Sequence, residues 1–280
     1  MKFVQPPTEP IVNVLLYGPP KTGKTIGAST APPGVLYMNC DLPDATRQAH
    51  VRHSDGSIME LEMPEEGKGG MLKLMAEVVN AINDPKQGMV ATVVIDPIGE
   101  LYRRILEDLS NRAVRPTLNN YGDAGTHLER FCRSLCRSPI NTVLCAHEWG
   151  YEKVGDEGME MGIWTGTRSN SVSVGQKIMG MVNIIGYTGL IVQEDGTKRW
   201  AAQLITGRGR QGGDRFAALD AVEDVDIQAW IAKIKAHESR AQHPQSAETR
   251  PEENPQPAEP EPEPEPPQPA RRTTRSRSKT

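Results

Sequence analysis

The first two hundred residues contain several short, almost uninterrupted apolar runs, separated by polar stretches that are rich in glycine and proline. Strands buried on both faces of a parallel sheet have this composition, because helices cover both of their faces. The pattern predicts four such strands, at residues 11–16, 35–40, 90–96 and 141–148. A glycine-rich turn and a short helical segment connect the first two, which makes a β-α-β unit and favours an α/β fold.

Apolar residues recur at helical spacing in other parts of the chain. The clearest case is 71–82, where the methionines and valines would face one side of a helix and pack into a core. Helices are predicted at residues 71–82, 98–109, 128–137, 177–181 and 227–236. We expect irregular structure at residues 42–70, apart from a hint of strand at 58–63, and at 111–126 and 149–175.

The pattern changes near residue 183, where two further strand-like runs follow each other closely. Residues 183–193 and 198–206 are joined by a segment that contains Asp195-Gly196, a pair typical of tight hairpin turns. We therefore expect an antiparallel hairpin that extends a mainly parallel sheet, followed by a loop rich in glycine and arginine at 207–215.

Beyond residue 238 the chain consists of Pro-Glu repeats and a basic end, ARRTTRSRSKT. Such a segment cannot form a core, because it has almost no apolar residues and carries much proline and like charge. We expect a flexible lead-in at 1–10, one folded domain at 11–238 and a disordered tail at 239–280. The tail is either a solubilising spacer or a segment that binds a partner or nucleic acid.

The first apolar strand runs into Gly18-Pro19-Pro20-Lys21-Thr22-Gly23-Lys24-Thr25, which matches G-x-x-x-x-G-K-[ST] at every fixed position. Gly18 and Gly23 allow the backbone angles that turn successive N–H groups toward a phosphate chain. Lys24 can reach the terminal phosphates, and the Thr25 hydroxyl can bind Mg²⁺. The sequence therefore predicts a nucleoside triphosphate, ATP, in contact with Gly18, Pro19, Pro20, Lys21, Thr22, Gly23, Lys24, Thr25 and Ile26.

Two polar residues end other apolar strands. Asp96 is the last residue of the strand at 90–96, where a carboxylate is expected to hold Mg²⁺ together with Thr25. His147 lies at the end of the strand at 141–148 and is either a sensor of the terminal phosphate or a structural cap of the strand.

Composition limits the kinds of partner and the cellular compartment that we expect for this protein. The net charge of −4 means that nucleic-acid binding would need a local basic patch. The spacing of the four cysteines, at 40, 132, 136 and 145, matches no common zinc site, so we expect reduced, buried thiols in a cytoplasmic protein. We find no apolar run long enough for a membrane span and no signal peptide, and expect no membrane contact.

With these parts in this order, residues 10–235 resemble the RecA-like P-loop ATPase core. More narrowly, they are similar to small phage nucleotide-binding proteins, including the Sak-type single-strand annealing recombinases. YGPPKTGKT resembles the Walker A strand and loop, and TVVIDPIGEL resembles the Walker B strand. TVLCAHEW resembles the strand whose polar tip relays the nucleotide state to a DNA-binding loop.

The resemblance implies roles for further residues. VLYMNCDLPDA resembles the strand whose end supplies the catalytic carboxylate, which places Asp41 in that role and leaves Asp44 as a nearby alternative. Arg208 and Arg210 resemble two basic residues that reach the ATP of the adjacent subunit, so hydrolysis would need a ring or a filament. The implied catalytic residues are Lys24, Asp41, Asp96, His147, Arg208 and Arg210.

The resemblance also implies a function, namely a Mg²⁺-dependent ATPase that acts on single-stranded DNA in phage-type recombination, repair or replication, in the host cytoplasm. Candidates for DNA contact are Tyr121, Trp149 and Trp164 by stacking and Arg112, Arg115 and Arg168 by charge. Two alternatives stay open. One is an ATPase loader or motor that binds a single-strand-binding or replication protein through the tail, and the other is a nucleotide-gated binding module with little hydrolysis.

Overall fold

The computed structural model describes residues 9–242 except 53–54, 56, 67, 85–89, 112–114, 153–158, 164–167, 193–195 and 208. The expected lead-in up to residue 8 and the expected tail from residue 243 onward lie outside the described residues. The last helix, α7 (Ile227–Gln242), continues beyond the expected domain end at residue 238.

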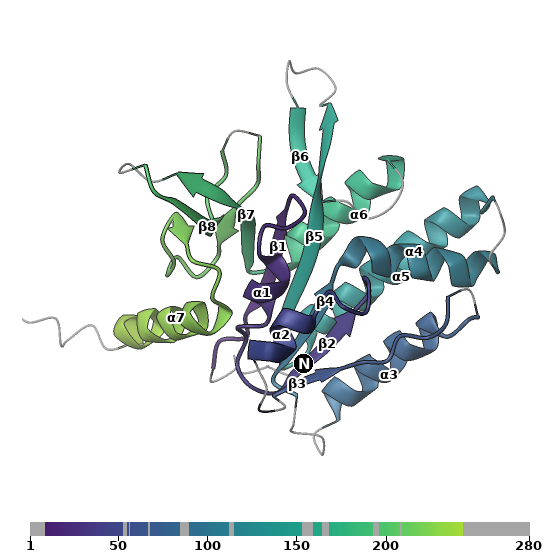
Figure 1. Ribbon diagram of the computed structural model, residues 1–280, viewed down its shortest axis with the longest axis horizontal. Helices are drawn as coiled ribbons and strands as arrows, with labels where there is room; N and C mark the ends of the chain where they lie inside the picture. Colours follow the sequence, from purple (N-terminus) through teal and green to yellow (C-terminus); the bar gives the residue numbers. More distant parts are fainter. Residues whose placement is uncertain are drawn as a thin grey trace, which may run out of the picture. The chain divides into compact units, whose positions relative to one another are not determined.

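A mixed sheet forms the centre of the described part of the chain (Figure 1). Its strands are β1 (Asn13–Gly18), β2 (Val35–Asn39), β3 (Ile58–Glu60), β4 (Thr92–Asp96), β5 (Asn141–Glu152), β6 (Met159–Ile163), β7 (Ile184–Val192), β8 (Lys198–Gln203), β9 (Gly213–Asp214) and β10 (Val222–Glu223). From edge to edge the order is β10-β8-β7-β1-β5-β4-β2-β3, so β1 lies in the interior of the sheet.

The strands from β7 to β3 in this order are parallel to one another, as the apolar runs predict. Antiparallel pairing occurs between β7 and β8, which form the expected hairpin, and between β8 and β10. Two short strands lie off this path and are also antiparallel to their partners: β6 pairs with β5 and β9 with β7. The expected α/β fold with a C-terminal antiparallel hairpin is confirmed.

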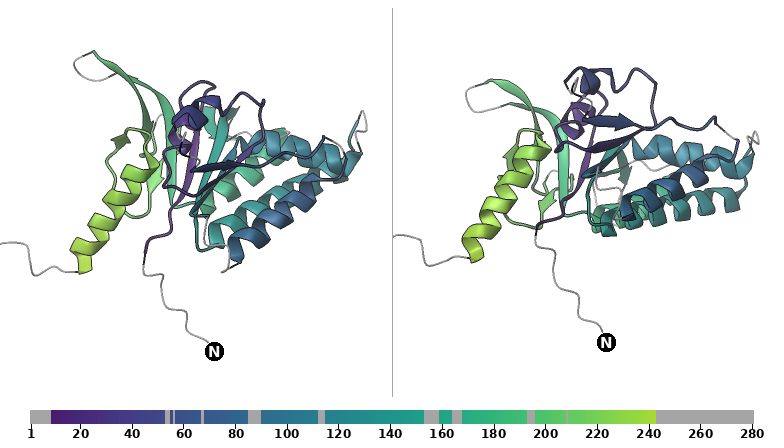
Figure 2. Two further views of the ribbon diagram at one scale, coloured as in Figure 1. Left: turned by 60° about the horizontal axis from the view of Figure 1, so that its bottom comes forward. Right: turned by 90° about the horizontal axis from the view of Figure 1, so that it is seen from below.

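Helices cover both faces of the sheet (Figures 1 and 2). They are α1 (Lys24–Ala28), α2 (Arg47–Arg52), α3 (Met71–Asn83), α4 (Ile98–Ser110), α5 (Leu118–Arg137), α6 (Arg168–Met181) and α7. Strand β1 shows why the apolar runs are uninterrupted: Leu15 and Tyr17 belong to the core with α3, α4, α5 and α6, whereas Val14 and Leu16 belong to the core with α1, α2 and α7. Alternate side chains of a strand point to opposite faces, and here both faces are buried.

The predicted packing of the methionines and cysteines is confirmed. The apolar stripe of α3 is buried against the sheet, including Met71 and Met75. All four cysteines are free thiols, and only Cys136 is partly exposed.

The expectation of an irregular segment over 111–126 is wrong in its second half, because α5 begins at Leu118 rather than at residue 128. Thr117 caps this helix, since its side chain accepts a hydrogen bond from the Asn120 N–H at 3.3 Å. The Asn120 side chain accepts one from the Thr117 N–H at 2.8 Å in return, which completes a capping box. An exposed leucine and two glycines in the first turns hide the apolar periodicity of the helix.

The expectation of irregular structure over 149–175 is also wrong for the part of this range that the structure describes, whereas 153–158 and 164–167 lie outside the described residues. Strand β5 continues to Glu152 and pairs with β6 from Glu148↔Ile163 to Glu152↔Met159. Helix α6 begins at Arg168 rather than at residue 177. An antiparallel ribbon that leaves the sheet has no need of a continuous apolar run, and the serines, asparagine and glycine of α6 are weak helix formers, so neither element has a clear pattern in the sequence.

The segment over 42–70 contains more structure than its sequence predicts. A short helix, α2, follows Thr46, and the strand expected at 58–63 is limited to β3, which pairs with β2 at the edge of the sheet. Within the described residues, no helix combines the length and apolar character that crossing a membrane requires.

Asp108 on α4 links two helices. Its carboxylate is 8% exposed and accepts hydrogen bonds from the N–H groups of Gly69 at 3.1 Å and Met71 at 2.6 Å, at the start of α3. We expect Asp108→Ala to lower the free energy of unfolding by about 2 kcal/mol, because the first N–H groups of α3 lose a charged acceptor. Urea unfolding measures this loss. Asp123→Ala, which removes an exposed carboxylate on α5, is the control, and an equal loss in both variants would contradict the capping role.

Candidate functional site

The glycine turn after β1 is held close to the neighbouring strand β7. A side-chain carbon at Gly18 would lie 2.3 Å from the carbonyl oxygen of Thr188, so only glycine fits at this position. Gly23 has a φ of 83°, a left-handed conformation that glycine adopts without strain. The Thr22 hydroxyl lies 2.7 Å from the Thr188 hydroxyl, which further ties the turn to β7.

Lys24, the first residue of α1, folds back over this turn. Its Nζ atom donates hydrogen bonds to the carbonyl oxygens of Gly18 at 3.1 Å and Pro19 at 2.6 Å. Burial lowers the pKa of Lys24, and the negative charge of Asp96 acts in the opposite direction. The ammonium group is therefore desolvated at the centre of the turn, where an anionic phosphate would be its natural counter-charge.

Asp96 ends β4 and is 8% exposed. Its Oδ2 atom accepts a hydrogen bond of 2.7 Å from the Tyr37 hydroxyl. Burial raises the pKa of Tyr37, and the charge of Asp96 raises it further. The phenol therefore stays protonated and acts as the hydrogen-bond donor to Asp96. Tyr37 thus binds one of the two residues that are predicted to hold Mg²⁺.

The residues that the sequence predicts to contact the nucleotide surround one cavity of about 520 Å³. It is lined by Pro20, Lys21, Thr22, Gly23, Lys24, Thr25, Ile26, Asp41, Asp96, Pro97 and His147. Gly18 and Pro19, which the sequence also predicts to contact the nucleotide, are not among the lining residues. Their carbonyl groups accept hydrogen bonds from Lys24. The cavity lies at the carboxyl ends of β1, β2 and β4, where ligands bind in open α/β sheets. His147 does not end its strand as expected, because β5 continues past it to Glu152.

Of the two candidate bases, only Asp41 lines the cavity. It directly follows the end of β2, and its N–H donates a hydrogen bond of 3.1 Å to the Asn39 side chain. Asp44 is exposed, and its main-chain carbonyl accepts from the N–H of Arg47 at the start of α2. The geometry therefore favours Asp41 for any chemistry in the cavity.

His147 lines the cavity beside the glycine turn, since it pairs with Gly18 in the register of β5 and β1. Among the described residues its Nδ1 atom is buried without a hydrogen-bond partner. Burial lowers its pKa, and the positive charge of Lys24 acts in the same direction. The ring is therefore neutral at neutral pH.

This lowered pKa predicts a pH dependence of stability. As the pH falls below about 6.5, His147 takes up a proton in the unfolded chain but not yet in the folded chain, because its pKa is lower in the folded state. The free energy of unfolding therefore decreases as the pH drops from about 6.5 toward the pKa of the folded state. We expect His147→Gln to reduce this loss. Urea unfolding of both proteins at pH 7.5 and pH 5.5 measures it, and an identical pH dependence would contradict the assignment.

Of the two arginines predicted to act on a neighbouring subunit, the described one, Arg210, is not part of the cavity lining. Arg208 lies outside the described residues. Arg210 packs over the ring of Tyr187, 4.2 Å from its centroid, and its Nε atom lies 3.8 Å from Oε2 of Glu148. The adjacent Gln211 main chain exchanges hydrogen bonds with the Tyr17 hydroxyl, so the loop that carries Arg210 is anchored to β1.

The candidates for DNA contact are distributed over several elements. Tyr121 lies on α5, half-buried against the core, whereas the side chain of Trp149 on β5 is 37% exposed. Arg115 precedes α5 and is exposed. Arg112 and Trp164 lie outside the described residues.

Sequence reasoning missed three side chains that shape the site. Tyr37 and Tyr17 lie inside apolar strands, where an aromatic residue indicates only packing, and Thr188 lies on a strand more than 160 residues from the turn that it holds. No local pattern identifies them, because the contact of Tyr37 depends on the pairing of β2 with β4 and that of Thr188 on the pairing of β1 with β7.

A buried strand, a glycine turn and a helix that places Lys24 and Thr25 beside Asp96 define a P-loop nucleotide-binding protein. Residues 12–223 match the AAA domain family AAA_24, and the chain belongs to this family. Family and site together make it a nucleotide-binding ATPase with a P-loop core.

Solved structures with a similar arrangement include the flagellar accessory protein FlaH from Methanocaldococcus jannaschii. It has 11% sequence identity and a TM-score of 0.39, over 77% of this chain and 87% of that chain. A KaiC-like protein from Pyrococcus horikoshii OT3 has 16% identity and a TM-score of 0.37, over 70% of this chain and 80% of that chain. The chain has no significant match among curated protein sequences.

Proposed function

We propose that this ATPase requires Mg²⁺ and acts on single-stranded DNA in recombination, repair or replication, as its resemblance to Sak-type phage recombinases implies. The observation that carries the proposal is the single cavity in which the glycine turn, Asp41, Asp96 and His147 meet. The ends of β1, β2 and β4 and the middle of β5 supply these groups, and each group has a chemical use in phosphoryl transfer.

The residues present fit ATP and Mg²⁺. Backbone N–H groups and the ammonium of Lys24 suit phosphate oxygens, and the hydroxyl of Thr25 and the carboxylate of Asp96 are the oxygen ligands that Mg²⁺ prefers. Bound there, Mg²⁺ would supply positive charge that offsets the charge of the phosphates.

In this proposal Lys24 exchanges its bonds to Gly18 and Pro19 for the terminal phosphates of ATP. Asp41 orients the attacking water and accepts its proton, while neutral His147 can donate or accept a hydrogen bond next to the terminal phosphate. Arg208 and Arg210 of an adjoining copy offset the developing charge, so hydrolysis depends on assembly into a ring or filament.

The proposed link to DNA follows the path of β5. His147 lines the cavity, and two residues later Trp149 lies on the ribbon of β5 and β6, which extends past the rest of the sheet (Figure 1). An exposed tryptophan can stack on unpaired bases. Single-stranded DNA bound on the ribbon and a nucleotide bound in the cavity would therefore both contact residues of β5.

The test uses the full chain and a fluorescently labelled single-stranded oligonucleotide, with and without a non-hydrolysable ATP analogue. We expect nucleotide-dependent binding, stimulation of ATP hydrolysis by the oligonucleotide and a loss of affinity of about 10-fold in Trp149→Ala. Leu118→Ala, which removes an exposed apolar side chain from α5, is the control.

Absence of single-strand binding, together with hydrolysis that DNA does not change, would overturn the DNA part of the proposal and leave the ATPase. In that case the acidic Pro-Glu repeat of the tail favours the alternative of a loader or motor that binds a basic protein partner. Removal of residues 243–280 would then abolish binding of that partner while hydrolysis continues.

A further inference from the structure

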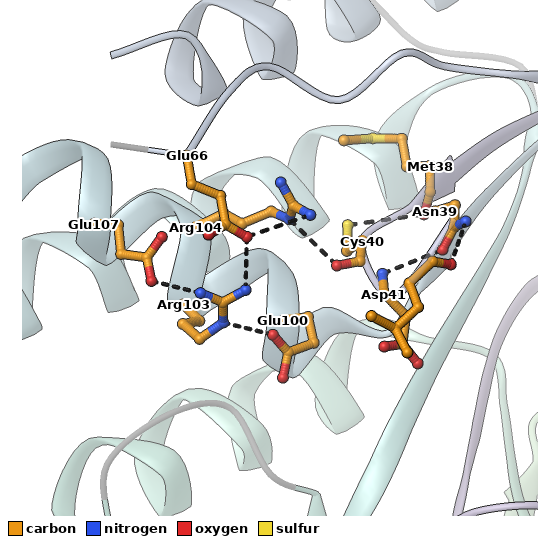
Figure 3. Close-up of polar contacts among 10 residues, drawn as sticks. Met38, Asn39, Cys40, Asp41, Glu66, Glu100, Arg103, Arg104 and Glu107 are labelled. Atoms are coloured by element: carbon orange, nitrogen blue, oxygen red, sulfur yellow. Dashed lines mark hydrogen bonds and ion pairs between the residues drawn. The ribbon is translucent and has the colours of Figure 1, made fainter. Parts of the chain in front are cut away.

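Asp41 occupies an unusual position for a residue that must orient a water molecule. It lines the cavity but is exposed, and it lies in a turn after the end of β2 rather than within a strand or helix. Because the surrounding core does not hold its side chain, the orientation of the carboxylate depends on how firmly the main chain of the turn is held. Side chains bind three main-chain groups of this turn, namely the Cys40 carbonyl, the Asp41 N–H and the Leu42 carbonyl (Figure 3).

Asn39 binds the turn from β2. Its side chain is 5% exposed, its Oδ1 atom accepts from the N–H of Asp41 at 3.1 Å, and its Nδ2 atom donates to the carbonyl of Leu42 at 3.1 Å. Nδ2 also donates to Oε1 of Glu60 on β3 at 2.9 Å. Only one orientation of the amide satisfies all three contacts, because a reversed amide would place its oxygen against two acceptors.

Arg104 binds the same turn from α4. Its Nε atom donates a hydrogen bond of 3.2 Å to the carbonyl of Cys40, directly before Asp41. Its Nη2 atom lies 3.6 Å from Oε1 of Glu66, and its side chain is only 14% exposed. The guanidinium is therefore held in place, and it holds the turn on the side opposite to Asn39.

We propose that Asn39 and Arg104 are positioning residues that hold the carboxylate of Asp41 toward the cavity. The inference rests on the proposed function, because it concerns the residue that orients the attacking water. A shift of the carboxylate by about 1 Å can cost about 100-fold in rate, so contacts that act only through the main chain can have large effects.

The neighbouring arginine offers a matched control. Arg103 lies on the same helix and binds the same Glu66 at 2.9 Å, but its other contacts are with Glu100 and Glu107 rather than with the turn. Figure 3 shows the two arginines side by side, with only Arg104 reaching Cys40. Arg103→Gln therefore removes a similar charge from a similar place without releasing Asp41.

The experiment compares Asn39→Ala, Arg104→Gln, Arg104→Lys and Arg103→Gln in the full chain. We expect kcat for ATP hydrolysis to fall about 10- to 100-fold in Asn39→Ala and Arg104→Gln, with KM and ATP affinity within about 2-fold of wild type. Arg104→Lys should recover part of the rate because it keeps a donor, and Arg103→Gln should keep the wild-type rate.

A second readout needs no ATP. Hydrogen exchange at the Asp41 amide, followed by NMR, should accelerate about 10-fold in Asn39→Ala, because the amide loses its acceptor, and should stay unchanged in Arg103→Gln. In an Asp41→Asn background, Asn39→Ala should lower kcat no further, since the residue that it positions is already inactive.

The outcomes separate the two proposals. If wild type hydrolyses ATP but Asn39→Ala and Arg104→Gln keep its kcat, or if their losses add fully to that of Asp41→Asn, the positioning role is overturned and the ATPase stands. If all four variants lose kcat and thermal stability together, the contacts are only structural and the positioning role is likewise overturned. If wild type shows no hydrolysis that depends on Lys24, the proposed function fails, and the positioning role with it.

Discussion

Replacement of Lys24 by alanine is expected to lower ATP hydrolysis by at least about 100-fold. The ammonium of Lys24 is almost completely buried within the glycine turn and binds two of the turn's carbonyl groups, Gly18 and Pro19. The substitution therefore removes the positive charge that would meet the terminal phosphates and also releases the turn. Steady-state release of inorganic phosphate and equilibrium binding of a fluorescent ATP analogue measure the two effects.

Lys24→Arg is also expected to fail, since a planar guanidinium does not fit the position that the ammonium occupies between the two carbonyls. Lys73→Ala is the control, because its side chain lies on α3, is 80% exposed and is remote from the cavity. Hydrolysis at the wild-type rate in Lys24→Ala would mean that the cavity is not the site of the ATPase.

Replacement of Asp41 by asparagine is expected to reduce kcat about 10²- to 10⁴-fold while ATP still binds. Asparagine keeps the size of the side chain and the N–H that Asn39 binds, but it cannot accept the proton of an attacking water. Single-turnover hydrolysis at saturating ATP separates this loss of chemistry from any change in binding.

Asp44→Asn tests the alternative that the sequence leaves open, namely that Asp44 rather than Asp41 is the base. Asp44 is exposed and lies outside the cavity lining, so its replacement is expected to leave kcat within about 2-fold of wild type. A large loss in Asp44→Asn with normal hydrolysis in Asp41→Asn would reverse the assignment of the base. Slow turnover already in wild type would favour the nucleotide-gated binding module.

The fold was predictable wherever burial on both faces of the sheet imposes a continuous apolar run. Strand β1 and its parallel neighbours β2, β4 and β5 all carry this pattern, and each lies within a few residues of its expected range. The hairpin of β7 and β8 was predictable for a different reason, since its turn residues mark the change of chain direction. Prediction failed for the beginnings of α5 and α6 and for the ribbon of β5 and β6, whose stability comes from tertiary contacts or a capping box rather than from a regular apolar pattern.

Much of the site could be inferred because its chemistry depends on local sequence. The glycine turn needs glycine at positions 18 and 23, and a polar residue at the end of a buried strand stands out from the apolar run before it. Residues that act across the sheet carry no such signal. Tyr37 lies inside β2 and reaches Asp96 at the end of β4, a contact that exists only because these two strands are paired.

By itself, the sequence determined the parallel core, the glycine turn with Lys24 and Thr25, and the polar residues Asp41, Asp96 and His147 that follow apolar runs, because each follows from neighbours in the chain. Only the tertiary structure decided which groups share the cavity, which of Asp41 and Asp44 faces it, and that Asn39 and Arg104 hold the turn between them. The physical reason is the order of the strands. Pairing of β1 with β5, of β5 with β4 and of β4 with β2 brings to one edge of the sheet groups that lie up to 130 residues apart, and no short-range pattern contains that order.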